Sequence, residues 1–79
     1  MNKDELEKNL GEQPLKIILE GNELSAKDLI AASRVPMTFK LVARACKGRR
    51  LTNRSKKTVL EALQLATDHV YTMKDIFNY

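Results

Sequence analysis

The sequence has few of the residues that build metal sites or cross-links in small proteins. It contains no tryptophan, one cysteine (Cys46) and one histidine (His69) among 79 residues. A single cysteine cannot form an internal disulfide bond, and one histidine beside one cysteine gives no cluster for a structural metal ion. We therefore expect neither a disulfide scaffold nor a metal site.

Long apolar runs are also missing. The longest unbroken runs, at 17–19 and 29–32, are far shorter than the roughly 20 residues of a membrane-spanning helix. The acidic, polar start of the chain, MNKDELEKNL, lacks the apolar core of a secretory signal. We expect no membrane association, and a cytoplasmic location.

Catalytic constellations are not evident either. There are no paired carboxylates, and no Ser-His-Asp or Cys-His arrangement stands at a recognisable spacing. Cys46 is expected to be a small buried side chain, and His69 a surface or half-buried residue. The sequence predicts no enzyme and no cofactor.

The apolar residues recur at helical spacing, without strand-like alternation or internal repeats. This predicts an all-α fold with a single domain over 1–79, a small bundle of four to five short helices. Residues 1–12 contain few apolar positions and are expected to be mobile.

Local signals set the first helix boundaries. Pro14 suits a first helical position, and Gly21 is expected to end that helix in a left-handed conformation. Ser25 and Asp28 form a capping box at the start of the next helix, which Pro36 should stop.

The later boundaries follow in the same way. Thr38 is an N-cap for a helix over 39–47 that Gly48 ends, and Thr52 is an N-cap for a helix over 53–67. A last helix is predicted over 70–77. The apolar face of this helix consists of Val70, Met73, Ile76 and Phe77. This face would close the core or, alternatively, form a dimer contact.

Charge is concentrated in the middle of the chain. Residues 26–58 hold ten lysines and arginines against one aspartate, whereas residues 1–25 and 59–79 are net acidic. This polarity is typical of a polyanion-binding surface, although a solvated basic face is the alternative.

The helix over 39–47 carries its cations on one edge. At about 100° per residue, Lys40, Arg44 and Lys47 share one stripe. The opposite face is apolar and consists of Leu41, Val42, Ala45 and Cys46. A helix of this kind fits the DNA major groove, but an ordinary amphipathic surface helix has the same pattern.

Further cations follow that helix. Arg49 and Arg50 lie in a loop, and Arg54, Lys56 and Lys57 lie in the first turns of the helix over 53–67. Cations at a helix N-terminus oppose its dipole, so their placement is easier to explain if phosphates bind there. The alternative is that local repulsion is tolerated.

These residues together resemble known DNA-binding domains. The segment from Leu15 to Leu63 resembles the phage Cro/repressor domain, and VARACKGRRLTNRSKKTVLEAL, Val42 to Leu63, resembles the headpiece of the lactose-repressor family. In that pattern a helix-turn-helix is followed by a basic loop with glycine, a Thr or Ser cap, and a helix with a cation three residues before V-L-x-A-L. The matching residues here are Lys56, Val59, Leu60, Ala62 and Leu63.

The resemblance implies a helix-turn-helix over 25–48, with a tight turn between its helices. Its internal packing positions would be Ala31, Ala32, Val35, Met37, Val42 and Ala45. Two departures from the family stand out. Pro36 occupies a turn position where glycine is usual, and Phe39 and Leu41 are unusually apolar for a recognition helix, so that either could contact a thymine methyl group or a protein.

The function that the sequence predicts is a sequence-specific, repressor-like regulator that places residues 38–47 in the major groove of double-stranded DNA. A homodimer on a two-fold site and a nucleoid-associated location are expected. The predicted contacts are Thr38, Phe39, Lys40, Ala43, Arg44, Lys47, Arg49, Arg50, Arg54, Lys56 and Lys57. The alternative function is a protein-interaction adapter of the same fold. RNA binding is a weaker third hypothesis, because no aromatic residues for base stacking interleave with the cations.

Overall fold

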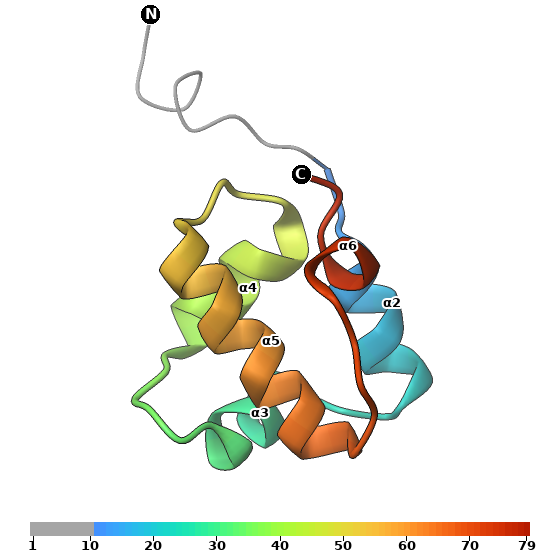
Figure 1. The fold of residues 1–79 in the computed structure, drawn as a ribbon, viewed down its shortest axis with the longest axis vertical. Helices are drawn as coiled ribbons and strands as arrows, with labels where there is room; N and C mark the ends of the chain where they lie inside the picture. The colour runs from blue at the N-terminus through green and yellow to red at the C-terminus, as the bar shows by residue number, and fades with distance from the viewer. Residues whose placement is uncertain (1–10) are drawn as a thin grey trace, which may run out of the picture.

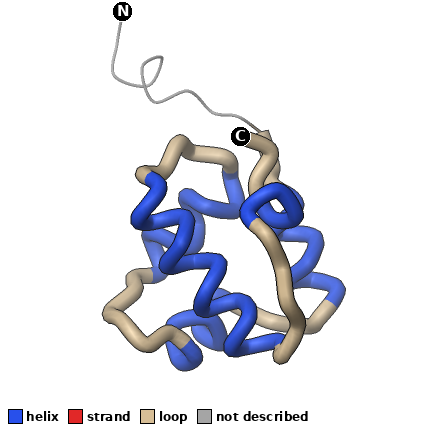
Figure 2. The backbone as a smooth tube through the Cα atoms, in the orientation of Figure 1, coloured by secondary structure: helices blue, strands red, loops and turns tan. Residues whose placement is uncertain are grey.

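The computed structural model describes residues 11–79, which form five helices and no strand (Figures 1 and 2). The helices are α2 (Pro14–Gly21), α3 (Ala26–Ala32), α4 (Phe39–Lys47), α5 (Asn53–Thr67) and α6 (Met73–Ile76). The predicted all-α class is confirmed. Mobility was expected for residues 1–12, of which residues 1–10 lie outside the described part. None of the described helices has the length and apolar character needed to cross a membrane.

The longest helix, α5, packs against α3, α4 and α6, and α2 packs against α4 and α6 (Figure 1). One apolar core lies between these helices. Its fully buried members come from every helix and include Leu15, Leu29, Ala45, Val59, Leu63 and Ile76. A chain of this size has only a small core, so each of these side chains matters for stability.

Side-chain caps define the two helices that carry most of the predicted contacts. The Thr38 hydroxyl oxygen accepts a hydrogen bond from the Leu41 amide at 3.1 Å, at the start of α4. The Thr52 hydroxyl oxygen does the same for the Ser55 amide at 3.1 Å, at the start of α5. Both helices therefore begin and end where the sequence predicted.

The end of α2 differs from the prediction. The left-handed residue is Glu23, with φ of 56°, and not Gly21. The Asn22 side chain donates to the Ile18 carbonyl at 2.8 Å, and the Leu24 amide donates to the Leu19 carbonyl at 2.8 Å. The carbonyls at the end of α2 therefore accept hydrogen bonds from Asn22 and Leu24. The chain reverses direction at Glu23, two residues after the glycine.

The connection between α3 and α4 is longer than the predicted tight turn. The six residues 33–38 separate Ala32 from Phe39, compared with about three to four residues in a helix-turn-helix. Pro36 explains the length, because it keeps the preceding residue extended and α4 cannot begin before the Thr38 cap.

The predicted helix over 70–77 is wrong in its first half. Val70 is 91% exposed, and the helix begins only at Met73, after a capping box between Thr72 and Asp75. The amide of Tyr71 donates to the Gln64 side chain at 3.0 Å, which ties this non-helical stretch to α5. In Figure 1 the stretch runs back from the end of α5 to α6.

Gly48 ends α4 in the left-handed conformation, with φ of 81°. It is buried against the backbone of Gly11, and a Cβ atom at this position would overlap the Gly11 carbonyl group. The glycine is therefore required both by its φ angle and by the close approach of another segment.

We predict that Gly48→Ala lowers the free energy of unfolding by about 3 kcal/mol, because it adds an unfavourable φ to a backbone clash. Gly21→Ala is the matched control: it has open space and an ordinary φ, so stability should stay the same or rise. Urea denaturation of both variants checks this. Equal stabilities would contradict the assignment of Gly48.

Candidate nucleic-acid interface

Helix α4 presents two different faces. Val42 and Ala45 are buried in the core, whereas Lys40 and Lys47 are exposed and Arg44 is half-buried. This is the orientation that the helical spacing predicted. The seven-residue separation of the two lysines corresponds to about 10 Å along the helix axis. The outward face of α4 is therefore a cationic stripe on a helix that is fixed by its opposite side.

More cations extend this stripe past the end of the helix. Arg50, Arg54 and Lys57 are exposed and Arg49 is half-buried, in the loop from 48 to 52 and the first turns of α5. Within residues 11–79 the only ion pair joins Lys16 to Glu12. The exposed and half-buried cations of α4, the loop and α5 thus have no side-chain carboxylate partner within residues 11–79. We define this basic surface as Lys40, Arg44, Lys47, Arg49, Arg50, Arg54 and Lys57.

Apolar side chains lie beside the start of α4. Phe39 is 63% exposed and Val35 is 50% exposed. Leu41 packs against the core. Of the two apolar residues that are unusual for a recognition helix, Phe39 and Leu41, only Phe39 therefore points outward. The remaining predicted contacts on α4, Thr38 and Ala43, are also exposed.

Two of the predicted internal packing positions are wrong. Val35 and Ala31 are exposed, whereas Met37 is buried as expected. Ser33 explains the difference at Val35: its hydroxyl donates to the Val35 carbonyl at 2.7 Å and accepts from the Val35 amide at 3.3 Å. This bend turns the valine side chain toward solvent.

Lys56 does not belong to the basic surface, although the sequence placed it among the contacts. Its side chain is buried, and its Nζ donates to the main-chain oxygen of Tyr79 at 2.7 Å. The same ammonium group lies 4.2 Å from the centre of the Tyr79 ring and 5.3 Å from that of Phe77. Lys56 therefore holds the C-terminal aromatic residues, and we leave it out of the proposed contacts.

No pattern in the sequence indicated the role of Gln13, which contacts the C-terminal end of α4. Its side chain is fully buried, and its main-chain amide donates to the Cys46 carbonyl at 2.9 Å. Its side-chain Nε2 donates to the Gly11 carbonyl at 2.9 Å, and its Oε1 accepts from the Asn78 amide at 2.7 Å. The only available signal was a polar residue directly before a helix-starting proline.

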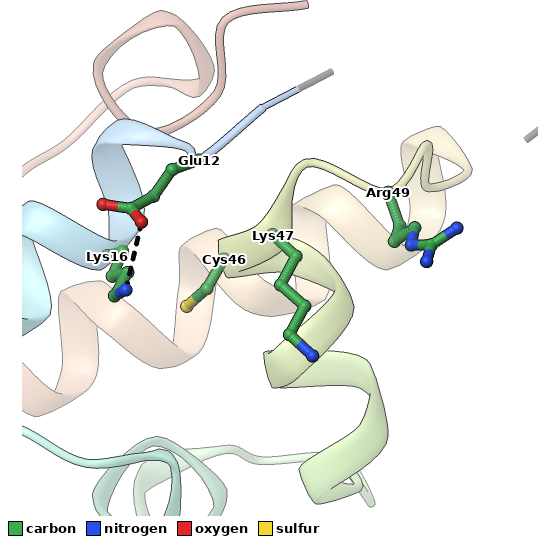
Figure 3. Close-up of a pocket in the computed structure, with 5 residues that line it drawn as sticks. All are labelled: Glu12, Lys16, Cys46, Lys47 and Arg49. Atoms are coloured by element: carbon green, nitrogen blue, oxygen red, sulfur yellow. Dashed lines mark hydrogen bonds and ion pairs between the residues drawn. The ribbon is translucent and has the colours of Figure 1, made fainter. Parts of the chain in front are cut away.

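A pocket of about 230 Å³ lies beside the same end of α4, lined by Glu12, Lys16, Cys46, Lys47 and Arg49. In Figure 3 the Cys46 thiol faces the paired Lys16 and Glu12, whereas Lys47 and Arg49 extend away from that pair. Burial raises the pKa of the Cys46 thiol, and Lys16 only partly opposes this effect. The thiol therefore stays protonated at neutral pH, which disfavours nucleophilic chemistry.

The adjacent lysines of α5 give a direct test of these assignments. Lys56→Met should lower the free energy of unfolding by about 2 kcal/mol, because a charge-assisted hydrogen bond and cation–π contacts are lost. Lys57→Met should leave stability unchanged, since that side chain is exposed. Chemical denaturation of the two variants measures this difference, and equal stability would contradict a structural role for Lys56.

No protein-family model matches the chain, and neither a curated protein nor a solved structure is significantly similar to it.

Proposed function

We propose that this chain is a sequence-specific, repressor-like transcription regulator that binds double-stranded DNA through the basic surface. In this proposal α4 lies in the major groove, and the loop and the start of α5 lie along the phosphate backbone. The observation that carries it is a run of seven exposed or half-buried cations along α4, the following loop and the start of α5, without an ion-pair partner among residues 11–79.

The geometry of α4 supports base readout. Its buried face fixes the helix, so the outward side chains of Lys40 and Arg44 are presented from a rigid support. Lysine and arginine are the side chains that most often contact guanine O6 and N7 in the major groove. Thr38, at the exposed start of α4, would add a hydroxyl contact to a base or phosphate.

The phosphate contacts are assigned to the other members of the surface. Arg49, Arg50, Arg54 and Lys57 stand around the start of α5, where exposed main-chain amides also favour anions. Phosphate contacts supply affinity but no sequence information. The first turn of α5 contains no acidic residue that would repel a phosphate group.

A homodimer is part of this proposal. A domain of 79 residues that presents one recognition helix contacts only a few base pairs, and two-fold related copies would double the contacted length. Binding to a nucleoid-associated site in the cytoplasm would follow from the same function.

The second candidate is a protein-interaction adapter, which the exposure of Phe39 and Val35 favours. These apolar side chains would then contact a partner protein, while the basic surface would accelerate encounter with an acidic one. If DNA is the partner, Phe39 would instead contact a thymine methyl group.

Salt dependence tests the phosphate contacts. In fluorescence-anisotropy titrations with random-sequence duplex DNA, four contacts should give a slope of log affinity against log salt of about −3.6. Lys57→Met should reduce the magnitude of that slope by about 0.9, and Lys74→Met, which removes an exposed cation from α6, should not. A wild-type chain that fails to bind DNA even at low salt would exclude this function.

Sequence readout is tested on duplexes that the wild-type chain selects from a random pool. Lys40→Ala combined with Arg44→Ala should abolish the preference for the selected sequence, since it removes the proposed base contacts. It should reduce affinity for random DNA much less. An unchanged preference would remove α4 from the interface, and the effect of Phe39→Ala on capture of a protein partner would then test the adapter function.

A further inference from the structure

The C-terminal residues lie against the basic loop from 48 to 52. The Tyr79 hydroxyl group donates a hydrogen bond to the Arg49 carbonyl at 3.1 Å and accepts one from the Leu51 amide at 3.0 Å. The two bonds are made on either side of Arg50. In Figure 1 the end of the chain and this loop lie at the same end of the molecule.

Tyr79 is itself held in place by buried groups. Its ring lies under the Lys56 ammonium group, and its main-chain oxygen accepts a hydrogen bond from that group at 2.7 Å. The neighbouring Phe77 is 2% exposed and its ring contacts that of Tyr79, with 5.6 Å between the centroids. The hydroxyl group is therefore presented to the loop from a fixed position.

The loop needs such a support. Arg49 and Arg50 follow the left-handed Gly48, and α5 begins only after Thr52. A loop rich in cations repels itself and loses conformational freedom when it binds an anion. An anchor that orders the main chain before binding removes part of that loss, which is the general advantage of preorganisation.

We propose that Tyr79 is a positioning residue for nucleic-acid binding, whose hydroxyl group fixes the main chain on both sides of Arg50 and thereby orients Arg49 and Arg50 toward phosphates. This inference rests on the proposed function. It also gives Lys56 its place: the buried lysine acts on DNA binding only through Tyr79. Neither residue touches the nucleic acid.

A double-mutant cycle on the full chain tests the proposal. Tyr79→Phe keeps the ring over Lys56 and removes the two hydrogen bonds, and the loop variant Arg49→Ala/Arg50→Ala removes the side chains that they orient. With random-sequence duplex DNA at low salt, Tyr79→Phe should weaken binding about threefold in the wild-type background. In the loop variant it should have no further effect.

The matched control is Tyr71→Phe. Tyr71 is also half-buried, and its hydroxyl group forms no hydrogen bond with residues 11–79. The DNA affinity and the stability of the Tyr71→Phe variant should therefore stay at the wild-type level. General loss of folded protein would lower affinity by the same factor in both backgrounds of the cycle. Equal factors for Tyr79→Phe would therefore overturn the proposal.

A second measurement reads the anchor without DNA. Amide hydrogen exchange at Leu51 should be faster in Tyr79→Phe than in the wild type, because its acceptor is lost, and unchanged in Tyr71→Phe. Unchanged exchange in Tyr79→Phe would overturn the inference. If the wild type binds DNA and Tyr79→Phe binds it equally well, the role of Tyr79 is overturned but the proposed function is not. If the wild type does not bind DNA, both are overturned.

Discussion

The buried residue Gln13 joins three parts of the chain that are far apart in sequence, through its main-chain amide and its side chain together. At the start of α2, its main-chain amide donates to the Cys46 carbonyl of α4, and its side-chain Oε1 accepts from the amide of Asn78 in the C-terminal segment. A buried amide that lacks its partners costs about 1 to 3 kcal/mol for each group, so this arrangement is stable only as a whole. The orientation of α4 and the docking of the C-terminal segment therefore depend on the same residue, Gln13.

The docked C-terminal segment in turn supports the loop that carries part of the basic surface. The C-terminal segment brings Phe77 and Tyr79 over the buried Lys56, and Tyr79 reaches the loop between α4 and α5. Gly48 allows that loop to begin immediately after α4, against the backbone of Gly11. The backbone that carries Arg49 and Arg50 is consequently held by contacts with Gly11 and Tyr79.

The helices could be predicted because their signals are local. Thr38, Gly48 and Thr52 lie directly beside the helix ends that they define, and the apolar spacing of α4 sets which face is buried. The burial of Lys56 and the exposure of Val70 could not be predicted, because they depend on partners elsewhere in the fold. Lys56 contacts a residue 23 positions away, and the stretch beside Val70 is held by Gln64. A charge count along the chain cannot separate Lys56 from Lys57.

The shielding of Lys56 also makes it an internal reporter. An amine-reactive label in solution meets the exposed Lys57 in the native chain, but meets Lys56 only after the C-terminal aromatic residues have moved away. The ratio of labelling at these two adjacent positions would therefore record how often that segment detaches. Mass spectrometry of a single peptide could follow this opening without a fluorophore or an added tag.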